Sequence, residues 1–300
     1  MNSLLFTGAS GFLGNNILPQ LRSNYDKVTT LGHLDSDDIK VNLAKDIPSL
    51  TEHYDIVLHA AGKAHMVPKT PEEEQLFYDV NHEGTKHLCK ALEAVGVPKS
   101  LIFISTVAVY GCEQGMLIDE AHPLSGTTPY AKSKIFAEQF LSEWCKKNNV
   151  VLTVLRPSLL AGVNPPGNLG DMIRGVEKGF YVNIAGGKVQ KSILMADDIA
   201  NLIPLVAEKG GVYNVCDTDQ PSFGQLSYLI ANQLGRRKPI SIPYWAAKRL
   251  ALIGDIVGRK FPINSQRLEK LTQSLTFSNQ KAIDALGWKP MKVLETLRIK

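Results

Sequence analysis

The first half of the chain alternates short apolar runs with longer stretches whose apolar residues recur at helical spacing. Several short runs are apolar at nearly every position, which is typical of parallel strands covered by helices on both faces. Such alternation predicts a parallel α/β architecture. Strands are expected at residues 3–7, 28–31, 55–60, 101–105 and 151–155, and helices at residues 11–21, 81–95 and 130–148, the first kinked or ended by Pro19.

The second half is less regular, with a Pro-Pro-Gly loop at residues 164–167. Ser222 and Gln225 form a capping-box pattern for a helix that ends near Gly235. Other helices are expected at residues 169–178 and 279–286, and a strand at 211–215 that returns to the sheet. We therefore expect one larger domain, residues 1–163 with about 187–217, and a smaller lobe, about 164–186 with 218–300.

Composition and charge exclude several classes of protein. The chain is 44% apolar and 21% charged, as in ordinary globular proteins, and its 33 basic and 29 acidic residues leave a net charge of +4, too small to indicate nucleic-acid binding. No apolar run approaches the ~18–20 residues that span a bilayer, so no membrane partner is expected. The first residues lack a charged leader pattern, which favours a cytoplasmic protein. The 4 cysteines and 7 histidines show no metal-ligand spacing, so no metal is expected.

A glycine-rich turn joins the first predicted strand to the first helix. Residues 7–14 read TGASGFLG, which places Gly8, Gly11 and Gly14 three residues apart. Glycines permit a tight turn and let backbone N–H groups approach a pyrophosphate at the helix start. At the beginning of a βαβ pattern, this turn predicts a dinucleotide cofactor.

The end of the second strand bears on the choice between NAD and NADP. An acidic residue at this point usually binds the adenosine 2′-hydroxyl of NAD, but the sequence has Gly32 and His33. Gly32 removes a charge that would repel a 2′-phosphate, and His33 can contact one. Asp35 can serve NAD if the loop turns back. The sequence therefore leaves NAD and NADP both open.

Tyr130 and Lys134 share one face of a predicted helix, because they are four residues apart. A tyrosine is a poor base at neutral pH, but a nearby ammonium and an oxidised nicotinamide would lower its pKa toward the working range. Lys134 can also hold the nicotinamide ribose. This pair predicts proton transfer coupled to hydride chemistry.

Hydroxyl side chains end the strand at residues 101–105, where ligands of parallel sheets bind. Thr106 is expected to share a hydrogen bond to a substrate hydroxyl with Tyr130, and Ser105 is the next candidate. His59 ends the preceding strand and is expected to be structural. The small residues that follow it, Ala60, Ala61 and Gly62, leave space for a cofactor.

With these motifs in order, nearly the whole chain resembles the extended short-chain dehydrogenase/reductase family. The resemblance rests on residues 7–14, 59–62, 80–85, 105–111, 130–134 and 156–157. It implies a Rossmann-type doubly wound parallel sheet with a smaller discontinuous α/β substrate lobe, and an NAD(P)-dependent enzyme acting on a nucleotide sugar. It also implies a catalytic set of Thr106, Tyr130 and Lys134.

The resemblance further implies which residues contact the cofactor and the substrate. Asn81 would position the central helix. Ser158 stands where many relatives have asparagine, and Lys191 where epimerases usually carry arginine, whose bidentate geometry a lysine lacks. Arg267 and Lys270 fit either diphosphate contacts or surface charges. The other implied cofactor contacts are Ser10, Phe12, Leu13, Asn42, Leu43 and Pro157, and the other implied substrate contacts are Asn168 and Leu169.

Several reactions remain open within this family. Its dehydratases carry an Asp-Glu pair directly after the catalytic threonine, where this chain has Val107 and Ala108, so a 4,6-dehydratase is not expected. A C4 epimerase with tightly held NAD and a 4-ketoreductase using exchangeable NADPH both fit. Alternatives are a reductase of another small carbonyl substrate and a non-catalytic dinucleotide sensor. By analogy with relatives, helices near residues 85–95 and 136–144 would pair two chains into a homodimer.

Overall fold

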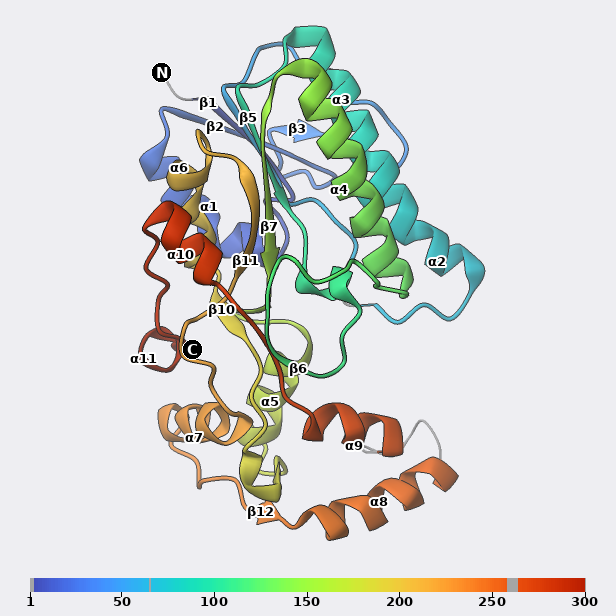
Figure 1. Cartoon of the computed structure of the whole chain (residues 1–300), viewed down its shortest axis with the longest axis vertical. Coiled ribbons are helices and arrows are strands. Elements are labelled where there is room, and N and C mark those ends of the chain that lie inside the picture. The colour runs from blue at the N-terminus through green and yellow to red at the C-terminus, as the bar shows by residue number, and fades with distance from the viewer. Residues whose placement is uncertain (1–2, 65, 258–263, 300) are drawn as a thin grey trace.

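The computed structural model describes residues 3–64, 66–257 and 264–299, apart from the side chains of Gln266, Arg267 and Lys270. Its central feature is a seven-stranded sheet in the order β11-β7-β5-β4-β1-β2-β3, with every neighbouring pair parallel (Figure 1). This confirms the predicted Rossmann-type sheet. The strands are β1 (Ser3–Thr7), β2 (Lys27–Gly32), β3 (Ile39–Lys40), β4 (Ile56–His59), β5 (Ser100–Ile104), β7 (Val151–Pro157) and β11 (Gly211–Val215).

Helices cover both faces of this sheet, which explains why its strands are apolar on both sides. In β1, Leu4 and Phe6 belong to one buried cluster, whereas Leu5 between them belongs to the other. The first cluster is completed by α1 (Phe12–Asn24), α6 (Asp197–Val206) and α10 (Gln280–Leu286), and the second by α3 (Gly84–Val95) and α4 (Pro129–Asn148) (Figure 1).

Two helices differ from the sequence prediction. α1 runs past Pro19 to Asn24, because Ile17 and Leu21 on either side of the proline are fully buried in the core. The predicted helix at residues 81–95 begins instead with a π-helical turn, η1 (Asp79–Glu83), which follows α2 (Pro71–Tyr78) without a break. Thr70 caps α2, and its side chain accepts a hydrogen bond from the Glu73 backbone N at 3.3 Å.

The remaining elements form smaller sheets and a second group of helices beyond one end of the large sheet (Figure 1). A separate buried cluster joins α5, α7 and α11 to β8 and β10. The short strands were not predicted, because two to four residues show no period. These elements are β6 (Gly115–Ile118), β8 (Leu159–Ala161), α5 (Gly167–Glu177), β9 (Asn183–Ile184), β10 (Ile193–Met195), α7 (Phe223–Gln233), β12 (Ser241–Ile242), α8 (Tyr244–Val257), α9 (Ser265–Thr272), β13 (Leu275–Phe277) and α11 (Val293–Thr296), with 3₁₀ turns η2 (Val107–Tyr110) and η3 (Ala185–Gly187).

Candidate active site

The glycine turn between β1 and α1 has the close backbone contacts that its sequence predicts. Gly8 has a positive φ of 81°, and a Cβ there would lie 2.6 Å from the backbone N of Ala61. A Cβ on Gly14 would lie 2.1 Å from the carbonyl oxygen of Ala9. Gly11 occupies the N-cap of α1, where no side chain accepts from the first N–H groups and no acidic residue lies in the first turn. The helix start is therefore suited to the pyrophosphate of a dinucleotide.

The neighbouring residues of the turn contribute mainly through their backbone. Leu13 is buried in the core cluster beside β1. Ser10 accepts a hydrogen bond from the Asn15 side chain through its carbonyl oxygen, at 3.1 Å. Phe12 lies at the far side of the turn, where its ring would be 3.3 Å from a Cβ on Gly162.

A carboxylate that the sequence prediction missed lies at the end of β2. The loop after β2 turns back, and a Cβ on Gly32 would lie 2.3 Å from Oδ2 of Asp37. Asp37 is 8% exposed, and its Oδ2 accepts from the Leu34 N–H at 3.0 Å. Asp35, which the sequence left open as a contact for NAD, is exposed and forms an ion pair with Lys40, and His33 is exposed too. The buried carboxylate next to Gly32, at the end of β2, is therefore that of Asp37.

The structure brings Lys134, Gly62 and Asn81 together from three separate elements. A Cβ on Gly62 would lie 3.2 Å from Nζ of Lys134 and 3.0 Å from Oδ1 of Asn81. Lys134 Nζ donates to the carbonyl oxygen of Ile104, the last residue of β5, at 2.8 Å. Lys134 therefore lies at the carboxyl edge of the sheet, on the same side as the glycine turn.

Asn81 fixes the position of α4. Its Oδ1 accepts from the Lys63 N–H at 2.7 Å, and its Nδ2 donates to the Lys63 carbonyl at 3.1 Å and to Oγ of Ser133 at 2.9 Å. Asn81 is fully buried and lies within the π-helical turn η1. This geometry agrees with the positioning role that the resemblance implies.

Thr106 and Tyr130 meet through their side-chain hydroxyls, which share a hydrogen bond. Thr106 caps η2, and its Oγ1 also accepts from the Ala108 N–H at 3.2 Å. Tyr130 lies in the first turn of α4, which Thr128 caps by accepting from the Ala131 N–H at 3.1 Å. The three predicted catalytic residues therefore lie on the ends of adjacent elements at one edge of the sheet.

The pKa values of Tyr130 and Lys134 differ from what the sequence led us to expect. Burial raises the pKa of Tyr130 above its usual value, and the hydrogen bond from Thr106 offsets this only in part. We expected the ammonium of Lys134 to lower this pKa, but in the protein alone the shift comes from burial, which is larger, and from the Thr106 hydrogen bond, not from Lys134. Burial also lowers the pKa of Lys134 to about 8, and the Glu138 carboxylate opposes that shift.

His59 is buried and hydrogen-bonded on both sides, to Thr7 at 2.7 Å and to Thr85 at 2.9 Å. Burial and the charge of Lys134 lower its pKa to about 3, so the ring is neutral at physiological pH. Both ring nitrogens are occupied inside the protein. These contacts support the structural role expected from the sequence.

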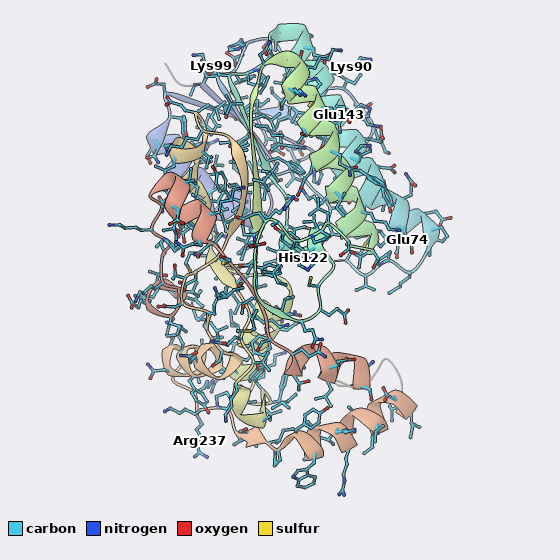
Figure 2. All side chains as sticks on the ribbon, in the orientation of Figure 1. Glu74, Lys90, Lys99, His122, Glu143 and Arg237 are labelled. Carbon is cyan, nitrogen blue, oxygen red and sulfur yellow. The ribbon has the colours of Figure 1, made fainter. Side chains whose placement is uncertain are left out.

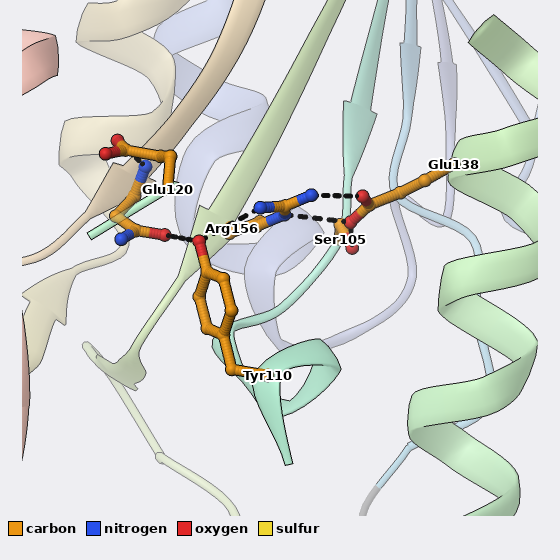
Figure 3. A network of polar contacts seen from close by, with 6 residues as sticks. Ser105, Tyr110, Glu120, Glu138 and Arg156 are labelled. Carbon is orange, nitrogen blue, oxygen red and sulfur yellow. Dashed lines mark hydrogen bonds and ion pairs between the residues drawn. The ribbon is translucent and has the colours of Figure 1, made fainter. Parts of the chain in front are cut away.

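A buried ion pair joins Arg156 and Glu138 (Figure 3). Arg156 Nη2 donates to Oε2 of Glu138 at 2.6 Å, and both side chains are less than a tenth exposed. Arg156 Nη1 also donates to the Tyr110 hydroxyl at 2.9 Å, and that hydroxyl donates to Asn214 at 2.7 Å. The network crosses from α4 to β7 and β11. The sequence signal for it was the spacing of Glu138, one helical turn after Lys134.

Ser105 belongs to this network. Its hydroxyl donates to the Glu138 carboxylate, and its side chain is 2% exposed (Figure 3). The predicted substrate contact of Ser105 is therefore replaced by a contact inside the protein, because β5 directs this side chain toward α4.

A cavity of about 690 Å³ lies beside this site, between the large sheet and the second group of helices. Its wall includes Val107, the residue after Thr106, and four predicted substrate contacts, namely Ser158, Asn168, Leu169 and Lys191. Arg267 and Lys270 were also predicted near the substrate, but their side chains lie outside the described residues.

The other predicted cofactor residues lie at or near the same edge of the sheet. Ala60 and Ala61 contact the glycine turn at Gly8. Pro157 is buried at the end of β7. Leu43 is buried beside Gly84, and Asn42 is exposed next to it.

Comparison with known proteins places these features in one family. The sequence model of the NAD dependent epimerase/dehydratase family matches residues 4–216. One relative is the N-acetyl-alpha-D-glucosaminyl-diphospho-ditrans,octacis-undecaprenol 4-epimerase of Escherichia coli O157:H7, which is 29% identical to the chain. The alignment covers 93% of this chain and 88% of that relative. A second relative, the UDP-glucose 4-epimerase of Vibrio cholerae, is 27% identical to the chain, and the alignment covers 98% of this chain and 92% of that relative.

A solved structure shares the fold. The UDP-glucose 4-epimerase of Thermotoga maritima with UDP-glucose superposes with a TM-score of 0.74 at 20% identity, covering 98% of this chain and 95% of that one. The family match confirms the expected class, an NAD(P)-dependent enzyme of the epimerase and reductase type. With its glycine turn, parallel sheet and Tyr-Lys helix, the chain belongs to the NAD-dependent epimerase/dehydratase family.

Proposed function

We propose that the protein is an NAD-dependent 4-epimerase of a sugar bound through a diphosphate to its carrier. The observations that carry this proposal are the hydrogen bond between Thr106 and Tyr130 and the position of Lys134 at the sheet edge that also holds the glycine turn. Residues 1–163 with about 187–217 would hold the dinucleotide, and about 164–186 with 218–300 the substrate.

The residues of the site fit a dinucleotide. The uncapped start of α1 would receive the pyrophosphate, and Lys134 beside Gly62 would hold the nicotinamide ribose. When bound, the oxidised nicotinamide supplies a hydride acceptor and a positive charge that favours the Tyr130 phenolate.

The phenol oxygen of Tyr130 would exchange a proton with the sugar 4-hydroxyl, and Thr106 would hold that hydroxyl through its own side chain. The buried ammonium of Lys134 is held at the end of β5, where it donates a hydrogen bond to the Ile104 carbonyl. Because Val107 and Ala108 follow Thr106, no carboxylate from these two positions is present for removal of water.

Asp37 favours an epimerase over a 4-ketoreductase that uses NADPH. Its carboxylate, beside Gly32, would accept hydrogen bonds from the adenosine ribose of NAD and would repel a 2′-phosphate. An epimerase needs firmly held NAD, because the hydride taken from the substrate must return to it. The two sequence relatives described above are also named as 4-epimerases.

The carrier of the sugar is either a nucleoside diphosphate or a lipid diphosphate. A nucleotide sugar is the substrate class expected from the sequence, and it is the class named for the Vibrio cholerae relative. The Escherichia coli relative is named for a sugar joined to undecaprenol through a diphosphate. We propose that Asn168, Leu169 and Lys191, which line the cavity, contact the diphosphate that both carriers share.

The cofactor and the reaction can be tested together on the purified protein. The bound dinucleotide is released by denaturation and identified, and UDP-sugars with an equatorial or an axial 4-hydroxyl are then incubated with the protein. We expect bound NAD and interconversion of the two sugars without consumption of added reductant. Stoichiometric consumption of NADPH, with a 4-keto sugar as the substrate, would overturn the proposal.

The role of Tyr130 is tested by the Tyr130→Phe variant. We expect kcat to fall by about 10²-fold or more, because the proton-exchanging oxygen is lost, while the dissociation constant of NAD changes little. The exposed Tyr228, changed to Phe, is the matched control. Normal turnover of the Tyr130→Phe variant would refute the proton-transfer role.

A further inference from the structure

The helix α8 presents an apolar face to solvent. Its small residues Ala247, Ala251 and Gly254 are buried, the first two against Leu268 of α9. At 100° per residue, the opposite side of the helix carries Trp245, Leu252 and Ile256, which are 61%, 52% and 88% exposed. The apolar side chains therefore point away from the protein, the reverse of an ordinary surface helix.

Exposed apolar side chains are concentrated in this part of the described chain. Single exposed hydrophobic residues are normal on a protein surface, whereas a contiguous group marks an interaction site. Between residues 240 and 257 the exposed large hydrophobic residues are Ile240, Tyr244, Trp245, Leu250, Leu252, Ile253, Ile256 and Val257.

Basic side chains accompany this apolar face. Residues 234–257 contain five basic residues and one acidic residue, a balance of +4 that equals the net charge of the whole chain. Arg236, Arg237 and Lys238 precede β12 and are exposed, and Arg237 extends from the end of the molecule that carries α8 (Figure 2). Within α8, the guanidinium of Arg249 lies over the Trp245 ring at 5.3 Å. This end of the molecule is therefore both apolar and positively charged.

The composition of this surface matches the headgroup region of a membrane. A helix that lies in this region has aromatic and aliphatic residues on one face, flanked by lysine and arginine that attract anionic lipids. A second copy of the chain would place the same positive charges against each other, which opposes pairing through this face. No helix within the described ranges is long and apolar enough to cross a membrane, so the contact would be peripheral.

We propose that α8 docks the enzyme on the surface of an anionic lipid bilayer, with Trp245, Leu252 and Ile256 in the headgroup region and Arg237, Lys248 and Arg249 on the lipid phosphates. This departs from the sequence expectation of no membrane partner. α8 packs on α9, and Leu271 of α9 lines the same cavity as Val107, the residue after Thr106. Docking through α8 would hold one wall of the substrate cavity next to the bilayer.

Vesicle binding by the full chain tests the proposal directly. The protein is centrifuged with vesicles of phosphatidylglycerol and phosphatidylethanolamine, and separately with vesicles of phosphatidylcholine alone. We expect binding to the anionic vesicles that weakens as salt is raised, and little binding to the neutral ones. Because Trp144 and Trp288 are buried, a blue shift of fluorescence on binding would report on Trp245.

The variant Ile256→Ser has a matched control in Val67→Ser, since the two side chains are 88% and 85% exposed. We expect the Ile256→Ser partition coefficient to fall about fiftyfold, because roughly three carbon atoms no longer enter the lipid. The Val67→Ser variant should bind like the wild type. The double charge reversal Lys248→Glu with Arg249→Glu should abolish the salt-dependent part of binding.

Three outcomes would overturn the proposal. These are no binding to anionic vesicles, equal binding of the Ile256→Ser and Val67→Ser variants, or a dimer in solution that Ile256→Ser dissociates in the absence of any vesicle binding. Circular dichroism and retained NAD confirm that each variant is folded. None of these readouts needs substrate turnover, so the result is separate from the fate of the proposed function.

Discussion

The carboxylate of Asp37 lies where a side chain on Gly32 would be, although the two residues are five positions apart in sequence. From this position we predict that Asp37 influences the choice between NAD and NADP. In the Asp37→Asn variant the charge that repels a 2′-phosphate is lost and the ribose bond weakens. We expect NAD affinity to fall about tenfold, as for one hydrogen bond to a charged group, and NADP affinity to rise.

Dissociation constants for both dinucleotides, measured by calorimetry, check this prediction. Asp35→Asn is the control, because Asp35 pairs with Lys40 on the surface. An unchanged preference in the Asp37→Asn variant would show that the ribose is held elsewhere.

Glu138 acts on the same site through Lys134. Burial lowers the pKa of Lys134 to about 8, and Glu138 raises it. The charged ammonium is therefore lost as pH rises through about 8, and NAD binding should weaken there. In the Glu138→Gln variant the opposing charge is gone, so we expect this weakening to begin about one pH unit lower.

The pH dependence of the NAD dissociation constant measures this shift. Glu143→Gln, an exposed position on the same helix α4, should leave the profile unmoved. The Glu138→Gln variant leaves Arg156 buried without its carboxylate, which costs about 3–5 kcal/mol of stability. Measurements are therefore made well below its melting temperature. A profile identical to the wild type would exclude the influence of Glu138 on Lys134.

At the scale of elements, the start of α1 depends on close packing against the turn that precedes it. In the Gly14→Ala variant the new methyl group would lie 2.1 Å from the Ala9 carbonyl, so α1 must move away from β1. We expect a loss of about 1–3 kcal/mol in the free energy of unfolding, and NAD affinity reduced by about tenfold or more because the helix N–H groups are displaced.

Thermal melting and NAD titration measure the two effects. Ser23→Ala lies near the other end of α1, where the hydroxyl bonds only the Gln20 carbonyl, and it should change neither quantity much. Gly14→Ala protein with wild-type NAD affinity would show that the backbone of this turn does not receive the pyrophosphate.

At the scale of the whole molecule, buried carboxylates tie the C-terminal segment to the sheet. Asp198, on α6, accepts from the Met291 N–H at 3.0 Å, and Asp217, just after β11, accepts from the Val293 N–H at 2.8 Å. Both carboxyl groups have pKa values raised by burial, that of Asp198 to about 6. The C-terminal helix α11 is thereby held against β10 and α7.

This raised pKa gives a prediction for stability against pH. A folded pKa of about 6, above the usual 3.8, means that Asp198 favours the folded state below about pH 3.8 and that this contribution is lost as pH rises through 6. Asp198→Asn removes the ionisation, so we expect it to stabilise the protein at pH 7.5 by at most about 3 kcal/mol. The advantage should shrink at pH 5.

Melting temperatures of the wild type and the variant at the two pH values provide the measurement. Asp284→Asn, on the surface helix α10, serves as the control. A variant that is less stable than the wild type at pH 7.5 would mean that the ionised carboxylate holds Met291 more strongly than burial penalises it.

Local sequence patterns were sufficient to predict the main helices and strands and part of the candidate site. The strands of the large sheet were predicted within two residues at each end, apart from the two-residue β3, because buried parallel strands are short and apolar. The glycine turn and the Tyr130–Lys134 spacing are also local, since each depends on residues within eight positions of one another. The sequence analysis did not predict α8, most of whose large apolar residues are exposed.

The sequence by itself determined the parallel α/β architecture, the cofactor turn and the residues that meet at the sheet edge, because period and turn chemistry act between near neighbours in the chain. Only the tertiary structure decided that the carboxylate of Asp37 packs against Gly32, that Ser105 turns inward to Glu138, and which face of α8 meets solvent. Each of these depends on how a loop or helix packs against segments distant in sequence. The spacing of residues along the chain does not predict contacts of this kind.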